Sequence, residues 1–175
     1  MPISNIRPAR ADEIAVLSAL DDDASKLFAE HGLPIELSAD HAFARAELAR
    51  WQRCAQLGQA FLAVDESGEA LGFAALDVVD GAPYLEQLDV RRAAMRRGIG
   101  ARLLAHSADW ARSVGGEELW LTTYGHLPFN RPYYERHGYE LVPEALCGPG
   151  IRAHLDEQRK VLPAPEQRVA MRCRL

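Results

Sequence analysis

Met95-Arg96-Arg97-Gly98-Ile99-Gly100 lies between an apolar run, residues 85–90, and a helical pattern, residues 101–114. A glycine-containing turn that leads from a strand into a helix leaves the first backbone N–H groups of the helix unpaired and pointing outward. Gly98 and Gly100 have no Cβ, so an anion can approach the backbone closely there. The stretch therefore predicts a strand, a turn and a helix that together bind a phosphate or a pyrophosphate.

Basic side chains surround this turn in a chain whose formal net charge is −5; they are Arg91, Arg92, Arg96, Arg97 and Arg102. Because the basicity is local, it suits a compact polyanion and not a nucleic acid, which needs a basic stripe. No Walker-type P-loop is present, and Leu103 stands where a dinucleotide fingerprint needs its third glycine. The alternative is an ordinary tight turn whose arginines serve solubility.

A second element, Tyr134-Glu135-Arg136-His137-Gly138-Tyr139, follows later in the chain. With Leu88-Asp89-Val90 and Gly98-Ile99-Gly100 it resembles the GNAT acetyltransferase superfamily. The signature of that family is an apolar strand ending in Val, then Gln/Arg-x-x-Gly-x-Gly/Ala opening a helix, then Tyr-x-x-x-Gly-Phe/Tyr. The resemblance covers about residues 61–139 and, more loosely, 168–172. Met95 departs from it, since the family usually has Gln or Arg there.

The resemblance implies an α/β (α+β) fold in a single GNAT-like domain over residues 1–175. It has a mixed, mostly antiparallel central sheet, helices on both faces, and a splayed parallel strand pair that holds acetyl-CoA, commonly with a bulge in the strand before the turn. Residue patterns alone predict strands at 3–8, 60–64, 71–79, 84–90, 119–123, 139–142 and 169–174. They also predict helices from Asp12 to a stop at Gly32, from Ser38 to about 57, and at 101–114, 131–137 and 152–160.

Three details of these elements are also predicted. Asp12 and Ser38 are expected to cap the first two helices. In the helix after the glycines, the apolar side is expected to hold Ile99, Leu103, Leu104, Trp110, Ala111 and Val114, with Arg102, His106 and Asp109 opposite. Residues 119–123 should run parallel to 84–90, because a helical crossover joins them.

The resemblance also implies where the ligand lies. The pyrophosphate is expected on the backbone of Met95, Arg96, Arg97, Gly98, Ile99, Gly100 and Ala101, and the pantetheine arm on Leu88, Asp89 and Val90. Asn130, Tyr133 and Tyr134 are further candidate contacts. Packing is the favoured role of Tyr133, and helix capping is an equal alternative for Asn130.

Acetyl transfer to an amine needs a base for the ammonium and an acid for the departing thiolate. Tyr134 is the candidate acid, with packing as its alternative role. Glu86 is the candidate base, because alternation places it on the same side as Tyr84 and Leu88, whereas Asp89 points the other way unless a bulge intervenes. His126 is the second choice of base, and a plain loop histidine is its favoured reading. A backbone N–H near 88–90 would stabilise the oxyanion.

The predicted function is acetyl-CoA-dependent N-acetyltransfer to a primary amine of a small molecule or peptide, with acetyl-CoA as cosubstrate and no metal. Alternatives are another acyl group, a hydroxyl acceptor, or a CoA-binding sensor without turnover. Asp21-Asp22-Asp23 could attract a cationic substrate, although a solvated helix face is the favoured reading.

Composition limits the remaining classes. Cys54, Cys147 and Cys173 form neither a disulfide framework nor a zinc motif, so buried or idle thiols are expected. No apolar run is long enough for a membrane span or a signal peptide, which predicts a cytoplasmic protein with no membrane and no nucleic-acid partner. A monomer and a homodimer both stay open.

Overall fold

The computed structural model describes residues 5–175, so the first two residues of the strand expected at 3–8 lie outside the described residues. The chain divides into two compact units. Unit 1 comprises Met1–Asp77 and Leu85–Ser107, and unit 2 comprises Val78–Tyr84 and Ala108–Leu175. Two strands, β3 and β4, and one helix, α3, contribute residues to both units.

The strands form a seven-stranded sheet with the order β1-β2-β3-β4-β5-β7-β6. The strands are β1 (Asn5–Pro8), β2 (Ala60–Val64), β3 (Ala70–Val79), β4 (Ala82–Val90), β5 (Glu118–Tyr124), β6 (Glu140–Val142) and β7 (Arg168–Arg174). The β1/β2, β2/β3, β5/β7 and β6/β7 pairs are antiparallel, whereas β4 and β5 are parallel and pair at Tyr84 and Trp120. This confirms the expected mixed, mostly antiparallel sheet with one parallel pair.

The helices are α1 (Ile14–Glu30), α2 (Ala42–Gln56), α3 (Ile99–Ser113), α4 (Arg131–Glu135) and α5 (Pro149–Val161). Short 3₁₀ turns lie at Ala11–Glu13 (η1), Arg92–Ala94 (η2), Glu144–Leu146 (η3) and Pro165–Gln167 (η4). All the helices and strands predicted from the sequence exist, with ends displaced by a few residues.

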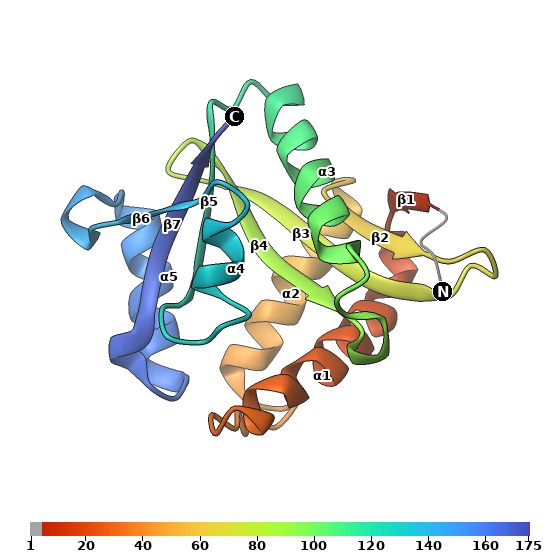
Figure 1. Cartoon of the computed structure of the whole chain (residues 1–175), viewed down its shortest axis with the longest axis horizontal. Coiled ribbons are helices and arrows are strands. Elements are labelled where there is room, and N and C mark those ends of the chain that lie inside the picture. The colour runs from red at the N-terminus through yellow and green to blue at the C-terminus, as the bar shows by residue number, and fades with distance from the viewer. Residues whose placement is uncertain (1–4) are drawn as a thin grey trace. The chain divides into compact units, whose positions relative to one another are not determined.

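In unit 1, helices cover both faces of the sheet (Figure 1). Even-numbered residues of β2 and odd-numbered residues of β3 pack against α1 and α2 in one core, which includes Leu17, Leu20, Trp51, Leu62 and Phe73. Alternation sends Phe61 and Gly72 to the other face. There the Phe61 ring meets His106 of α3 at 4.4 Å, and a Cβ on Gly72 would lie 3.3 Å from Leu103.

In unit 2, α5 packs on the sheet through Ile151 and Leu155, in a core with Tyr84, Val142 and Ala170. The turn between β3 and β4 anchors the start of this helix. Asp80 Oδ1 accepts from Gly150 N at 2.8 Å and Asp80 Oδ2 from Ile151 N at 3.0 Å. A carboxylate therefore caps α5 from a residue far away in the chain.

Two predicted helix caps are wrong. The Asp12 side chain accepts from Arg10 Nε and lies inside η1, so it does not cap α1. The second helix begins at Ala42 and not near Ser38, and His41 Nδ1 accepts from Phe43 N as its cap. The stop at Gly32 is confirmed, because α1 ends at Glu30 and Gly32 has φ 75°.

The predicted apolar face of α3 is wrong at one end. Ile99, Leu103, Leu104 and Ala111 are buried as expected, but Val114 is 51% exposed and lies after the last helical residue. The hydroxyl of Ser107 donates to Leu103 O, which allows this polar residue to be fully buried.

Candidate active site

The glycine turn in unit 1 forms a concave set of backbone donors. Arg96 and Gly98 both have positive φ, 60° and 78°. The first helical bond of α3 runs from Arg102 N to Gly98 O at 3.1 Å, and among residues 5–175 the amides of residues 96–101 have no backbone acceptor. A Cβ on Gly98 would meet no atom within 4 Å, so the approach to these amides is open. The loop therefore has the backbone geometry of the nests that bind anions at helix N-termini.

The arginines around this nest differ in their partners. Arg91 forms an ion pair with Glu69 and Arg92 with Glu30. Arg96 and Arg97 are exposed, and no acidic side chain within residues 5–175 pairs with either of them. The positive field at the turn therefore comes mainly from these two side chains and from the helix N-terminus.

Residue counting places a bulge in β4, before the nest. Asp80 and Gly81 both have positive φ, as in a two-residue hairpin turn that pairs Val79 with Ala82. If the β3/β4 ladder continued from that turn without interruption, Leu71 would pair with Val90. Instead, the N–H of the next residue, Arg91, donates to Leu71 O at 2.8 Å. One extra residue therefore lies in β4, which is the feature that the family resemblance led us to expect.

The bulge changes which side chains share a face. Glu86 pairs with Arg50 of α2, with Nε and Oε1 2.6 Å apart, and its side chain is 5% exposed. Gln87 donates to Asp21 of α1 at 3.2 Å. Consecutive residues thus reach the same helical layer, which strict alternation forbids.

Asp89 belongs to this layer as well. Strict alternation placed its side chain on the face opposite to Glu86, and this is wrong because the bulge that the prediction allowed for is present. Gln87 Nε2 donates to Asp89 Oδ2 at 2.9 Å and to Asp21 Oδ1 at 3.2 Å, so one amide holds the two carboxyl groups close together. Burial raises the pKa of both carboxyl groups, and the charge of Asp89 raises the pKa of Asp21 further. Two carboxyl groups held this close together disfavour a state in which both carry a negative charge.

No sequence pattern predicted this pair. The acidic run 21–23 favoured a solvated face, but Asp21 is half-buried against β4. The sequence analysis also missed Arg50, because its partner Glu86 lies far away in the chain. Only the bulge brings these side chains together, and a bulge has no reliable sequence pattern.

In unit 2, Tyr134 of α4 is buried and its ring makes edge contacts with Tyr133 and Tyr139, with centroids 5.5 Å apart in each case. Burial raises the pKa of Tyr133 and of Tyr139. The aromatic cluster therefore fixes the ring of Tyr134, which a proton donor and a packing residue both require.

Asn130 occupies the N-cap position of α4, but its side chain makes no capping bond. The capping alternative is therefore wrong. Its Oδ1 atom is buried and accepts no hydrogen bond from the described part of the chain. An unpaired buried amide oxygen is unfavourable unless a ligand or water donates to it.

The remaining candidates are unremarkable. His126 is exposed in the loop after β5, and its ring lies edge-on to Tyr124 at 5.7 Å. Cys54 and Cys147 are buried and Cys173 is half-buried; burial raises the pKa of Cys54 to about 12, so this thiol is not a nucleophile. No cluster of metal-binding side chains occurs within residues 5–175, and no helix in that range is long and apolar enough to cross a membrane.

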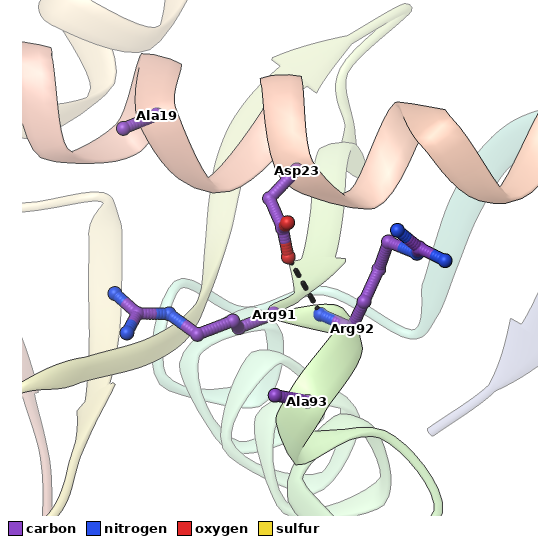
Figure 2. A pocket seen from close by; sticks show the side chains of 5 residues that line it. All are labelled: Ala19, Asp23, Arg91, Arg92 and Ala93. Atoms are coloured by element: carbon purple, nitrogen blue, oxygen red, sulfur yellow. Dashed lines mark hydrogen bonds between the residues drawn. The ribbon is translucent and has the colours of Figure 1, made fainter.

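A polar cavity of about 620 Å³ lies in unit 1 between α1 and η2. Figure 2 shows Asp23 pointing from α1 to the backbone of Arg92, whose N–H donates to Asp23 Oδ2 at 2.7 Å. The side chains of Arg91 and Arg92 extend in opposite directions, and Ala19 and Ala93 complete the lining. The cavity was not predicted from the sequence.

Comparison with known proteins identifies the class of protein that this fold and nest define. Residues 21–139 match the acetyltransferase (GNAT) family. The match covers more than half of the chain, and the chain belongs to this family.

Individual relatives agree with the family. The chain is 28% identical over 142 residues to the uncharacterized N-acetyltransferase YhfO of Bacillus subtilis, a match that covers 78% of this chain and 89% of that protein. It is 34% identical over 90 residues to streptothricin acetyltransferase of Streptomyces lavendulae, covering 50% of this chain and only 45% of that protein. The structure of PaiA N-acetyltransferase from Thermoplasma acidophilum in complex with coenzyme A has a TM-score of 0.71 at 15% identity, with 100% of both chains covered, which supports the fold.

Proposed function

We propose that this protein transfers an acetyl group from acetyl-CoA to the primary amine of a small molecule or peptide, by direct attack within a ternary complex. The observation that carries the proposal is the open nest of amides at residues 96–101, which follows a bulged strand in a member of the acetyltransferase family. The coenzyme complex of PaiA N-acetyltransferase adds support for the donor.

The amides at residues 96–101 would bind the pyrophosphate of the coenzyme, and the exposed guanidinium groups of Arg96 and Arg97 would strengthen its attraction. Backbone groups of residues 88–90 would pair with the amides of the pantetheine arm, because the bulge interrupts the β4 ladder close to them. The buried Oδ1 of Asn130 is available to accept from a ligand N–H.

In the reaction, the amine nitrogen attacks the thioester carbonyl carbon and forms a tetrahedral intermediate. A backbone N–H near residues 88–90 would stabilise its oxyanion. The C–S bond then breaks, the nitrogen loses its proton, and the thiolate gains one. No covalent enzyme intermediate is required, because the thioester is already activated and binding supplies proximity.

Tyr134 is the proposed proton donor to the thiolate. Support comes from its match to the family tyrosine and from the aromatic cluster that holds its ring. Glu86 stays the proposed base, acting through water. Since Glu86 forms an ion pair with Arg50, this role requires that the pair loosen when the carboxylate takes up a proton.

The coenzyme site is tested with a matched pair of variants, Gly98→Asp and Gly98→Asn. Asn has the size of Asp and tolerates positive φ, so the two differ mainly in charge. We expect titration calorimetry to show that Gly98→Asp binds acetyl-CoA at least about tenfold more weakly than Gly98→Asn, a difference of about 1.4 kcal/mol. Equal affinities would show that the pyrophosphate does not lie on this nest.

Turnover is tested by thiol release against amines, polyamines, peptide N-termini and antibiotics, with streptothricin included because of the relative from Streptomyces lavendulae. Release that depends on an acceptor supports transfer. Coenzyme binding without release for any acceptor would favour the sensor alternative, to which the departure at Met95 also points.

A further inference from the structure

The two halves of α1 are held in different ways. The buried residues of this helix are Leu17, Leu20 and Ala24, and they all precede Ser25. Beyond them, polar contacts tie the helix to η2: Arg92 N donates to Asp23, and the Arg92 guanidinium pairs with Glu30. The cavity of about 620 Å³ lies beneath these contacts (Figure 2). In the C-terminal half of α1, residues 22–30, Ala24 is the only buried side chain among the described residues, and polar contacts tie this half to η2 beside the cavity.

The contact between Asp21 and Asp89 stands at the boundary between the two halves. Gln87 Nε2 lies 3.2 Å from Asp21 Oδ1 and 2.9 Å from Asp89 Oδ2, so one amide spans both carboxyl groups. Two carboxyl groups held on one amide nitrogen favour a proton on one of them, because a single negative charge avoids the repulsion between two. This contact joins α1 to the segment of β4 that enters η2.

The groups around the pair disfavour a second negative charge. The charge of Asp22 of α1 raises the pKa of Asp21, and the charge of Glu47 of α2 raises the pKa of Asp89. The neutral groups that donate to the pair are Ser25 of α1 and Gln87 of β4. Removing the shared proton leaves two like charges held on one amide.

We propose that the Asp21–Asp89 pair is a proton-dependent latch, which holds the C-terminal half of α1 against the end of β4 and releases it over the cavity when the shared proton is lost. In the latched form α1 borders the cavity, whose lining side chains Asp23, Arg91 and Arg92 are already partly exposed. In the released form α1 moves away from these side chains and the cavity widens. The latch is a property of the fold and does not depend on the proposed acetyl transfer.

The direction of the pH effect follows from linkage. The latched state binds a proton that the released state, whose carboxyl groups have ordinary pKa values, gives up above about pH 4. The latch is therefore intact at low pH and weakens as pH rises through the raised pKa values. Where the two states differ by one proton, the opening constant rises about tenfold per pH unit.

Hydrogen–deuterium exchange of the full chain tests the latch. Peptides covering residues 22–30 are followed from about pH 5 to about pH 9, which brackets the pKa of about 8 to which Asp21 is raised, with correction for intrinsic exchange. We expect the protection of this segment to fall with pH, by up to about tenfold per unit, while that of β2 stays constant. A pH-independent protection of residues 22–30 would overturn the proposal.

Asn substitutions supply the matched controls. Asp21→Asn mimics the protonated carboxyl group and should make the protection of residues 22–30 independent of pH. Asp22→Asn removes the same charge one residue away and should keep the dependence, with its midpoint shifted to lower pH. If Asp21→Asn does not fold, Asp89→Asn makes the same test from β4. A pH dependence that persists in the folded Asn variant of the pair would also overturn the proposal.

Discussion

Replacing Gly72 with Ala would test how closely β3 approaches the bulged end of β4. A Cβ at this position would lie 2.5 Å from the carbonyl oxygen of Asp89 and 3.2 Å from Val90 Cα. Both atoms are backbone atoms, so no side-chain rotation can relieve the contact. Restoring an ordinary separation requires β4 to move by about 0.7–0.9 Å at Asp89, because carbon and oxygen seldom approach within about 3.2–3.4 Å.

Overpacking of this kind costs about 1–3 kcal/mol in a well-packed core. For a chain of this length, each kcal/mol lowers Tm by about 2–4 °C, so we expect Gly72→Ala to lower Tm by about 2–12 °C. The displaced segment is also the one proposed to bind pantetheine, and acetyl-CoA affinity should fall at least about threefold. Thermal unfolding and titration calorimetry measure the two effects on the same sample.

Gly125→Ala is the matched control, because a Cβ there meets only ordinary contacts of 3.4 Å or more. This variant should change Tm and acetyl-CoA affinity little. A Gly72→Ala variant with the Tm of the unsubstituted protein would refute the close approach of β3 and β4. A destabilised variant with unchanged coenzyme affinity would instead separate this segment of β4 from the coenzyme site.

Arg97→Ala should weaken acetyl-CoA binding less than Gly98→Asp does, and its deficit should shrink at high salt, because an exposed guanidinium acts through a screened field; calorimetry at two salt concentrations decides this. Tyr134→Phe should lower kcat roughly ten- to a thousandfold with little change in coenzyme binding. A smaller loss of kcat with more acidic leaving thiols would identify Tyr134 as a proton donor, and an unchanged kcat would show that its role is structural. Asp80→Ala should lower the free energy of unfolding by about 1–2 kcal/mol through the lost cap of α5, and Asp80→Asn by less, as denaturant titration would show. A hydrogen bond from an arginine lowers the pKa of Glu13 from 4.5 to about 2. The Glu13 carboxylate should therefore stabilise the fold above about pH 4.5, and this stabilisation should be lost as the pH falls toward 2. Glu13→Gln should make Tm depend less on pH in this acid range.

The elements and the nest could be predicted because their signals are local. Gly98 and the apolar periodicity on either side specify a strand, a turn and a helix within a short stretch, and the helix N-terminus follows from that order. The two helix caps were predicted wrongly because Asp and Ser are the usual N-cap residues, whereas a histidine, His41, caps α2. Val114 was misplaced because periodicity does not say where the last turn ends.

The carboxyl pair could not be predicted, because it depends on a long-range contact and on one extra residue in a strand. Alternation along 84–90 placed Glu86 and Asp89 on opposite faces, and the bulge brings both to one layer. The acidic run that includes Asp21 carries no sign of a partner on β4. Strand register and helix docking are set by packing of the whole fold, so only the structure reveals which acid meets which.

The cap that Asp80 provides for α5 has a consequence for the order of synthesis. The carboxylate joins residues 70 and 71 positions later in the chain. Unit 2 begins with a short hairpin segment, Val78–Tyr84, and resumes only at Ala108. On the ribosome, this hairpin emerges long before the helix that it caps, and the segments that complete unit 1 emerge in between. The nascent chain must therefore keep the hairpin tip unsatisfied and exposed to solvent until α5 has left the exit tunnel, which makes unit 1 the first that can close and unit 2 the later one.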